Sequence, residues 1–174
     1  MANTLDSLIA KQDITELIYL YMRGLDRWDS DLLHSLFTDD AWCEYGFMNG
    51  NAPDFIDFAI AALSAHAANQ HFVGNILIDV EGDEAFGEVY FNAYHKIPGE
   101  TGFDDVIIAG RYLDRYERRN GQWKFAYRSE WVDWSNTAAT NDPYFEMAPD
   151  GLVSGRKDDA VYDRARRYRP ADAV

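Results

Sequence analysis

The sequence VIIAGRYLDRYERRNGQWKFAYRSEWVDW, residues 106–134, contains two long runs with a period of two, 106–118 and 122–134, joined by Arg119-Asn120-Gly121. A period of two is typical of β-strands, because successive side chains point to opposite faces of a sheet. Asn-Gly between two such runs is the strongest short-range signal for a tight hairpin. The pattern therefore predicts two long antiparallel strands.

The same period continues on the N-terminal side of this hairpin. Residues 71–80 and 85–97 predict two further strands around a turn at Glu81-Gly82-Asp83, and residues 41–48 predict a shorter strand. Four consecutive long strands without intervening helices exclude a doubly wound parallel sheet.

Helical periodicity is confined to the first part of the chain. Apolar residues recur near every 3.6 positions in 5–29, 31–37 and 53–67. Helices followed by antiparallel strands indicate an α+β fold, in which N-terminal helices pack in a strongly curved antiparallel sheet to form a cone-shaped α+β barrel. The mouth of such a cone is a natural apolar pocket.

Periodicity is weak after the last predicted strand. We expect residues 1–135 to form the barrel domain and residues 136–174 to form a C-terminal tail or lid packed on the same domain, with a short helix near 159–168.

Composition restricts the function. The 174 residues are 47% hydrophobic and 15% aromatic, and the net charge is −14. Nucleic-acid binding and binding to an anionic membrane both need a surplus of Lys and Arg, so neither is expected. No apolar run approaches a membrane helix, and the first residues lack the features of a secretory signal, so the sequence indicates a cytoplasmic protein. The aromatic content suits a sheet and also a ring-lined pocket.

Motifs for cofactors and metals are missing from the sequence. There is no phosphate-binding glycine loop and no GxSxG nucleophile turn. His71 and His95 could in principle ligate a metal with a carboxylate, but no HxH or HExxH spacing supports this. The single cysteine, Cys43, lies in a predicted strand, where a buried inert thiol is expected. We therefore predict neither a cofactor nor a bound metal.

Two histidines lie at equal distances from residue 83, near which the predicted hairpin is centred. His71 and His95 should consequently be cross-strand neighbours in the hairpin. Both could simply be hydrogen-bonded residues of the sheet. Asp26 offers a second interpretation, because it borders the apolar stripe of the first helix and needs a partner there. A carboxylate that binds an imidazole fixes its tautomer and leaves the far nitrogen as a base. The alternative is a solvated aspartate at the helix end.

The residues around Asp26 and His71 resemble those of the SnoaL-like branch of the nuclear-transport-factor-2-like superfamily. The chain is most similar to the group that contains scytalone dehydratase, hexachlorocyclohexane dehydrochlorinase and bile acid 7α-dehydratase. The resemblance covers roughly residues 5–135. It rests on Tyr21-x-x-x-x-Asp26, on Gln-His-Phe-Val-Gly at 70–74 and on the late hairpin at 116–125.

The resemblance implies roles for particular side chains. Asp26 and His71 match the catalytic dyad of that group, His95 matches the second histidine of the scytalone dehydratase pattern, and Tyr45 matches its tyrosine. Arg128 matches an arginine of the dehydrochlorinase and bile acid dehydratase patterns. Because Arg128 shares strand parity with Lys124, an outward surface position is also open. The candidate walls of the pocket are Tyr21, Phe47, Tyr112, Trp123 and Trp131, and Phe145 and Met147 are candidates for a lid.

These expectations together describe a cofactor-independent lyase. Asp26 and His71 would remove a proton, and a small aromatic or polycyclic hydroxylated substrate would lose water. A cofactorless C–C lyase, a polyketide-type cyclase or isomerase, and a non-catalytic ligand-binding domain remain alternatives, because the fold alone does not choose among them. Large apolar residues on both faces of the sheet, with the family resemblance, predict a homo-oligomer, a trimer ahead of a dimer.

Overall fold

The computed structural model describes residues 4–147, 155–156 and 158–168 of the chain. Contacts divide the chain into two compact units, Met1–Thr140 and Asn141–Val174. The first unit contains α1 (Leu5–Arg27), α2 (Ser30–Leu36), β1 (Phe37–Glu44), β2 (Asn49–Asn51), α3 (Ala52–Ser64), β3 (Ala68–Glu81), β4 (Glu84–Pro98), β5 (Phe103–Arg119) and β6 (Gln122–Ala139). The second contains α4 (Tyr144–Met147) and the short 3₁₀ helices η1 (Ala160–Tyr162) and η2 (Arg164–Arg167).

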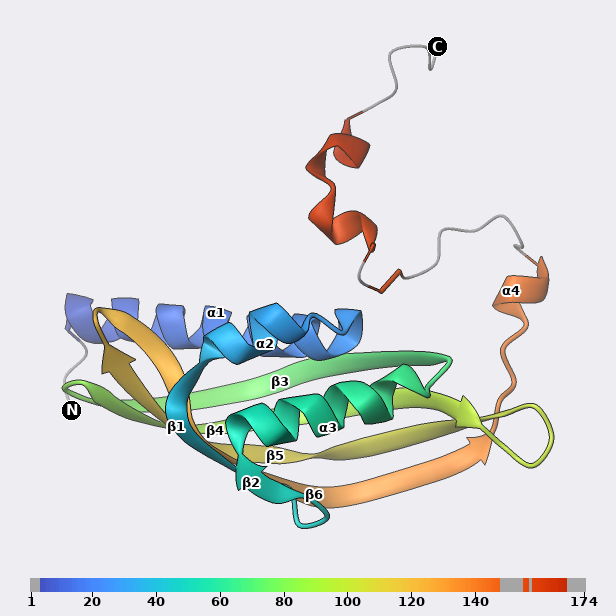
Figure 1. The fold of residues 1–174 in the computed structure, drawn as a ribbon, viewed down its shortest axis with the longest axis horizontal. Coiled ribbons are helices and arrows are strands. Elements are labelled where there is room, and N and C mark those ends of the chain that lie inside the picture. Colours follow the sequence, from blue (N-terminus) through green and yellow to red (C-terminus); the bar gives the residue numbers. More distant parts are fainter. Residues whose placement is uncertain (1–3, 148–154, 157, 169–174) are drawn as a thin grey trace. The chain divides into compact units, whose positions relative to one another are not determined.

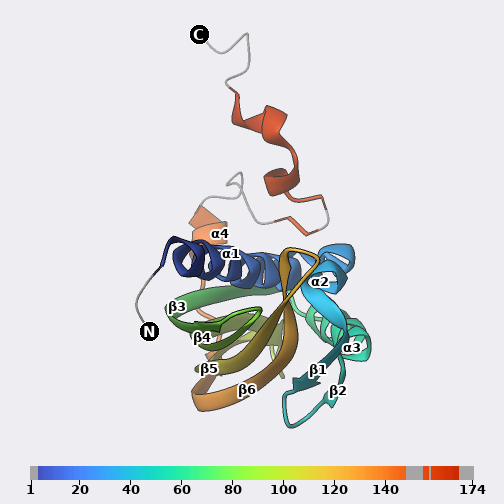
Figure 2. The same ribbon diagram turned by 90° about the vertical axis from the view of Figure 1, so that its left-hand side faces the viewer.

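Side-chain caps fix where the three helices of the first unit begin. Thr4 and Ser7 form a reciprocal capping box at the start of α1. Asp29 accepts a hydrogen bond from the backbone N–H of Leu32 at 3.0 Å and caps α2, and Asn51 caps α3. The helices lie on one side of the curved sheet, as Figures 1 and 2 show. This arrangement confirms the predicted α+β class.

The sheet is mixed, whereas the sequence predicted an antiparallel one. Its strand order is β2-β1-β6-β5-β4-β3, and every neighbouring pair is antiparallel except β1 and β6, which run parallel. The first strand of the chain therefore pairs with the last. β1 begins at Phe37, before the predicted strand start at residue 41, because pairing with β6 begins there.

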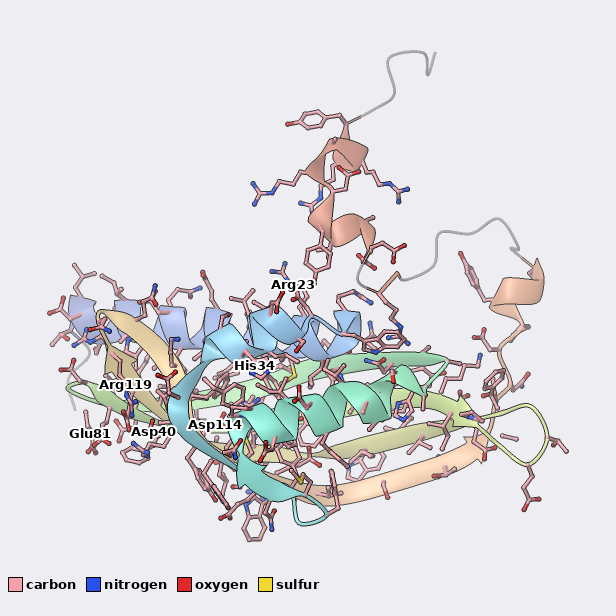
Figure 3. The ribbon with its side chains drawn as sticks, in the orientation of Figure 1. Arg23, His34, Asp40, Glu81, Asp114 and Arg119 are labelled. Carbon is pink, nitrogen blue, oxygen red and sulfur yellow. The ribbon has the colours of Figure 1, made fainter. Side chains whose placement is uncertain are left out.

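Both predicted hairpins form. Arg119 pairs with Gln122 across Asn120 and Gly121, which have φ of 53° and 77°, as a tight two-residue turn requires. The two hairpin turns lie at the same end of the sheet, where Figure 3 labels Glu81 and Arg119. Arg119 also pairs there with Asp40 at 2.8 Å. At the other end, β6 continues to Ala139, beyond its predicted end at residue 134, because it keeps pairing with β5.

Two extra residues interrupt the regular alternation of β6. Tyr116 pairs with Phe125 and Arg115 pairs with Tyr127, so Ala126 is a bulge. A second bulge lies at Asp133, since Gly110 pairs with Val132 and Ala109 pairs with Trp134. A bulge shifts the faces to which the following side chains point. The inner face of β6 therefore carries Phe125 before the first bulge, and Arg128 and Glu130 after it.

The core lies between the helices and the inner face of the sheet. Cys43 is buried there, and burial raises the pKa of its thiol to about 12, which fits an inert cysteine. None of the helices that the structure describes has the length and apolar character needed to cross a membrane.

Candidate active site

A cavity of about 310 Å³ opens inside the first unit. Its apolar lining comes from α1, from the segment after β1, from α3 and from the strands β4 and β5. The polar side chains that reach it are Tyr21, Tyr45, His66, His71, His95, Tyr112 and Glu130. Its size lies at the lower end of the range for small-molecule sites, and an apolar wall with a few polar groups is typical of them.

Asp26 and His71 are joined by a short hydrogen bond. The Asp26 Oδ1 lies 2.8 Å from the His71 Nδ1, and only 10% of the Asp26 side chain and 6% of the His71 side chain are exposed. Asp26 is near the end of α1 and His71 is near the start of β3, and α1 packs on β3. An ionised carboxylate only accepts hydrogen bonds, so Nδ1 carries a proton, and in the neutral imidazole the free lone pair is then on Nε2.

Further donors hold the carboxylate of Asp26. The backbone N–H of His71 donates to both oxygens at 3.1 and 3.2 Å, and the Asn69 Nδ2 donates to Oδ1 at 2.9 Å. These bonds fix the carboxylate against β3 and so fix the imidazole that it binds. The sequence did not point to Asn69, because an asparagine at the start of a strand has many ordinary roles.

His95 lies beside His71 but not directly opposite it. The register pairs His71 with Ala93 and Asn69 with His95, so the expectation of a direct pair was wrong by two residues. One residue of the offset comes from the turn, which is centred between Gly82 and Asp83 because Glu81 pairs with Glu84, and the other comes from a register shift between Val73 and Ile76. Residues 93 and 95 share a face, and the rings of His71 and His95 meet edge to face at 5.4 Å.

His95 is a neutral imidazole near pH 7. Burial and the nearby His71 and His66 lower the pKa of His95 to about 3. The His66 ring lies 5.0 Å from the His95 ring, just beyond the end of α3. The helix predicted over residues 53–67 included His66, but α3 ends at Ser64. The structure instead places His66 in the wall of the cavity.

Tyr45 and Tyr21 share a hydrogen bond inside the cavity. Their hydroxyl oxygens are 2.7 Å apart, and the Tyr45 ring stacks on Phe55 with a centroid distance of 4.1 Å. Burial raises the pKa of both phenols, that of Tyr45 well above its usual value. Near neutral pH both are therefore hydrogen-bonding hydroxyls rather than phenolates.

Arg128 is fully buried behind the wall of the cavity. Its Nε and Nη2 bind the two oxygens of Asp114 at 2.8 and 2.7 Å, and its guanidinium lies 4.2 Å from the ring centres of Tyr21, Tyr112 and Phe125. The bulge at Ala126 turns Arg128 inward although Lys124 belongs to the opposite face. Arg128 is not part of the cavity lining, so in this structure it holds the rings of two lining tyrosines.

The other predicted walls divide between the cavity and other places. Phe47 and Tyr112 line the cavity with Tyr21. Trp131 does not, because it follows the inward Glu130 and its side chain is on the outer face, 57% exposed. Trp123 also lies outside the cavity lining and packs in the core below the Arg118 guanidinium.

The two predicted lid residues, Phe145 and Met147, belong to α4 in the second unit. The side chain of Phe145 lies outside the described residues. Their role as a lid stays a prediction.

Glu130, like His66, is a polar residue of the cavity that the sequence did not single out. It pairs with Tyr112 across β5 and β6, on the inner face of the sheet. Burial raises the pKa of Glu130 to about 7, although His71, a hydrogen bond with Tyr112 and Arg128 act in the opposite direction. Only the bulge at Ala126 brings Glu130 inside, and nothing in the sequence marks that bulge.

Metal-ligating side chains do not gather within the described part of the chain, where no group of three or more His, Cys, Asp or Glu residues could hold an ion. The absence of a metal from the reaction stays a prediction.

Solved structures share this fold. Hexachlorocyclohexane dehydrochlorinase LinA-type3 from Novosphingobium barchaimii is 23% identical, with a TM-score of 0.70, and the match covers 79% of this chain and 95% of that one. A scytalone dehydratase-like protein from Novosphingobium aromaticivorans is 24% identical, with a TM-score of 0.68 and coverage of 77% and 91%. The Kfla4162 protein from Kribbella flavida is 19% identical, with a TM-score of 0.67 and coverage of 72% and 92%. Identities this low establish the fold alone.

Curated protein sequences give no match to this chain. The family model of the SnoaL-like domain matches residues 6–129, which include Asp26, His71, His95 and the start of the last strand. This match confirms the resemblance seen in the sequence: the chain belongs to the SnoaL-like domain family.

Proposed function

We propose that the protein is a cofactor-independent lyase that removes water from a small aromatic or polycyclic hydroxylated substrate. One observation carries the proposal. The Asp26 Oδ1 lies 2.8 Å from the His71 Nδ1, and His71 borders an aromatic cavity of about 310 Å³. A buried carboxylate–imidazole pair beside a small apolar cavity is the arrangement that general base catalysis needs.

The base in this reaction is the Nε2 of His71. It takes a proton from the substrate carbon next to the carbon that bears the hydroxyl, and the C–H electron pair becomes the second bond of a C=C. The C–O bond breaks, and the oxygen leaves as water after it receives a proton. Asp26 keeps Nε2 available as the acceptor and stabilises the imidazolium once it forms.

Hydrogen-bond donors surround the place where the oxygen leaves. Neutral His95 and the Tyr45–Tyr21 pair can donate to an oxygen of the substrate and so favour the charge that develops on it. The rings of Phe55, Phe91 and Tyr112 supply flat apolar walls, which favour an aromatic substrate.

A panel of compounds tests this proposal. The purified protein is incubated with vicinal diols, β-hydroxy carbonyl compounds and diaryl diols, and the products are followed by absorbance and by formaldehyde release. We expect a new conjugated chromophore without formaldehyde. Formaldehyde would instead indicate C–C cleavage, and ligand binding without turnover of any compound would indicate a binding domain.

Two histidine variants show whether the turnover depends on the dyad. His71→Ala should abolish most of it. The matched control is His34→Ala, because the Nε2 of His34 lies 3.8 Å from the Asp57 Oδ1 in a histidine–aspartate pair outside the cavity. Turnover that survives in folded His71→Ala would contradict the proposal, and loss of turnover in His34→Ala would show that the effect is not specific to the dyad.

A further inference from the structure

His95 and Tyr45 both line the cavity with His71, but both are poor donors of the proton that a leaving hydroxyl needs. Burial and the neighbouring histidines lower the pKa of His95 to about 3, so its imidazolium is scarce near neutrality. A neutral imidazole and a buried phenol hold their protons too tightly to release them fully to a leaving hydroxyl. Each can donate a hydrogen bond, but another group has to give up the proton.

Glu130 has the position for this role. It lines the same cavity as His71, and it stands opposite Tyr112 on the inner face of β5 and β6. His71 reaches the cavity from β3, which is an edge strand of the sheet. Glu130 reaches it from β6, and β4 and β5 lie between these two strands. A substrate in the cavity thus has a base on one wall and a carboxyl group on another.

Glu130 has few charged or titratable neighbours. The residues of α3 that line the cavity are apolar. Five titratable or charged groups interact electrostatically or by hydrogen bonding with Glu130: Tyr21 of α1, Tyr45 after β1, His71 of β3, Tyr112 of β5 and Arg128 of β6. Burial has a larger effect on the pKa of Glu130 than any of these groups, and it raises that pKa to about 7. About half of the Glu130 carboxyls therefore carry a proton at pH 7.

We infer that Glu130 is the general acid of the proposed lyase and gives its proton to the departing hydroxyl. His71 Nε2 takes the proton from carbon, the C=C forms, the C–O bond breaks, and the hydroxyl leaves with the proton of Glu130 as water. The enzyme is left with an imidazolium and a carboxylate. Return of that proton from His71 to Glu130, through solvent in the cavity, restores the starting state. The inference rests on the proposed function.

The test compares leaving groups. Each enzyme is given 4-hydroxy-4-phenylbutan-2-one and the matching 4-acetoxy compound, since hydroxide needs a proton to leave and acetate does not. Glu130→Gln should lose on the order of 10²–10⁴-fold on the hydroxy compound. Its loss on the acetoxy compound should be at least ten times smaller. The matched control is Asp133→Asn, which removes a carboxylate of the same strand that binds Arg111 outside the cavity.

The pH dependence gives a second readout. A general acid acts in its protonated form, so the wild-type rate on the hydroxy compound should fall as the pH rises through about 7, and Glu130→Gln should lack this decline. Equal losses of Glu130→Gln on both compounds, or an unchanged decline in that variant, would overturn the inference. His71→Ala should be inactive on both compounds, and its activity would overturn the proposed function instead.

A third readout needs no turnover. Because the pKa of Glu130 is raised above 4.5, the folded protein holds this proton more tightly than the unfolded chain. The stability from that proton is present below pH 4.5 and is lost as the pH rises through about 7. The melting temperature of Glu130→Gln relative to the wild type should therefore increase between pH 5 and pH 8. A constant difference would overturn the inference.

Discussion

At the scale of single residues, the candidate site depends on which side chains are uncharged near neutral pH. His95 and Glu130 both line the cavity, and burial keeps both in their neutral forms to different degrees. Neutral His95 does not compete with His71 for the negative charge of Asp26. Glu130 keeps a proton in the pH range in which His71 needs to be free of one. The environments of Glu130 and His71 thus separate an acid from a base.

Tyr112→Phe should shift the pH profile rather than abolish activity. The hydrogen bond of Tyr112 lowers the pKa of Glu130, so its removal raises that pKa further. The decline of kcat/KM at high pH should therefore move to higher pH. Tyr127→Phe is the control, because the Tyr127 hydroxyl binds Glu44 at an exposed site and should leave the profile unchanged. A shift to lower pH in Tyr112→Phe would contradict the account.

The residue patterns explain which parts of the site could be predicted. Asp26 borders an apolar helical stripe and His71 begins a strand after a helix, so both could be found from the sequence. A strict period of two from Trp123 and Phe125 would place Trp131 inside and Glu130 outside. The extra residue Ala126 reverses these positions, which is why the sequence identified the tryptophan and missed the glutamate.

At the scale of elements, local signals predicted the helices and both hairpins, because caps, Gly-containing turns and periodicity lie within a few residues of one another. The parallel pairing of β1 with β6 has no such signal, since it joins strands that are far apart in the sequence. The lengths of strands were also underestimated, as in β6, because pairing with a neighbour extends a strand through residues of little periodicity.

Gly110 allows the second bulge of β6, and its replacement should destabilise the sheet. A Cβ added at Gly110 would lie 2.9 Å from the Val132 Cα and closer still to the Trp131 carbonyl oxygen. Gly110→Ala should therefore cost about 1–3 kcal/mol in the free energy of unfolding, measured with denaturant. Gly74→Ala is the control, because its Cβ would lie 3.6 Å from the Tyr90 Cβ, an ordinary contact. Equal stability of the two variants would show that the bulge does not need a glycine.

At the scale of the whole molecule, the outer face of the sheet carries large apolar side chains. Phe72, Phe86, Leu113 and Trp131 are each more than a third exposed in the single chain. Large exposed apolar side chains of this kind occur at interfaces between subunits. The homo-oligomer stays a prediction.

Light scattering at micromolar concentration tests the oligomer. We expect an assembly, a trimer ahead of a dimer, and Leu113→Glu should shift it towards the monomer because it places a charge on the outer face. Leu8→Glu, at an exposed position of α1, is the matched control. A monomeric wild-type protein would contradict the prediction.

The C-terminal unit offers a further prediction for the whole chain. If Phe145 and Met147 close the mouth of the pocket, replacing both with alanine should raise KM more than it lowers kcat. The control is Tyr162→Ala, a substitution elsewhere in the same unit. Unchanged steady-state constants in Phe145→Ala/Met147→Ala would remove the lid from the account.

A double-mutant cycle in kcat/KM shows whether Asp26 and His71 act together as the base. His71→Ala and Asp26→Asn should each lose about 10²–10⁴-fold, and the double variant should be little worse than either one. The corresponding cycle with His34→Ala and Asp57→Asn should show no loss. Near-wild-type turnover by folded His71→Ala, or losses that simply multiply in the double variant, would contradict this joint role.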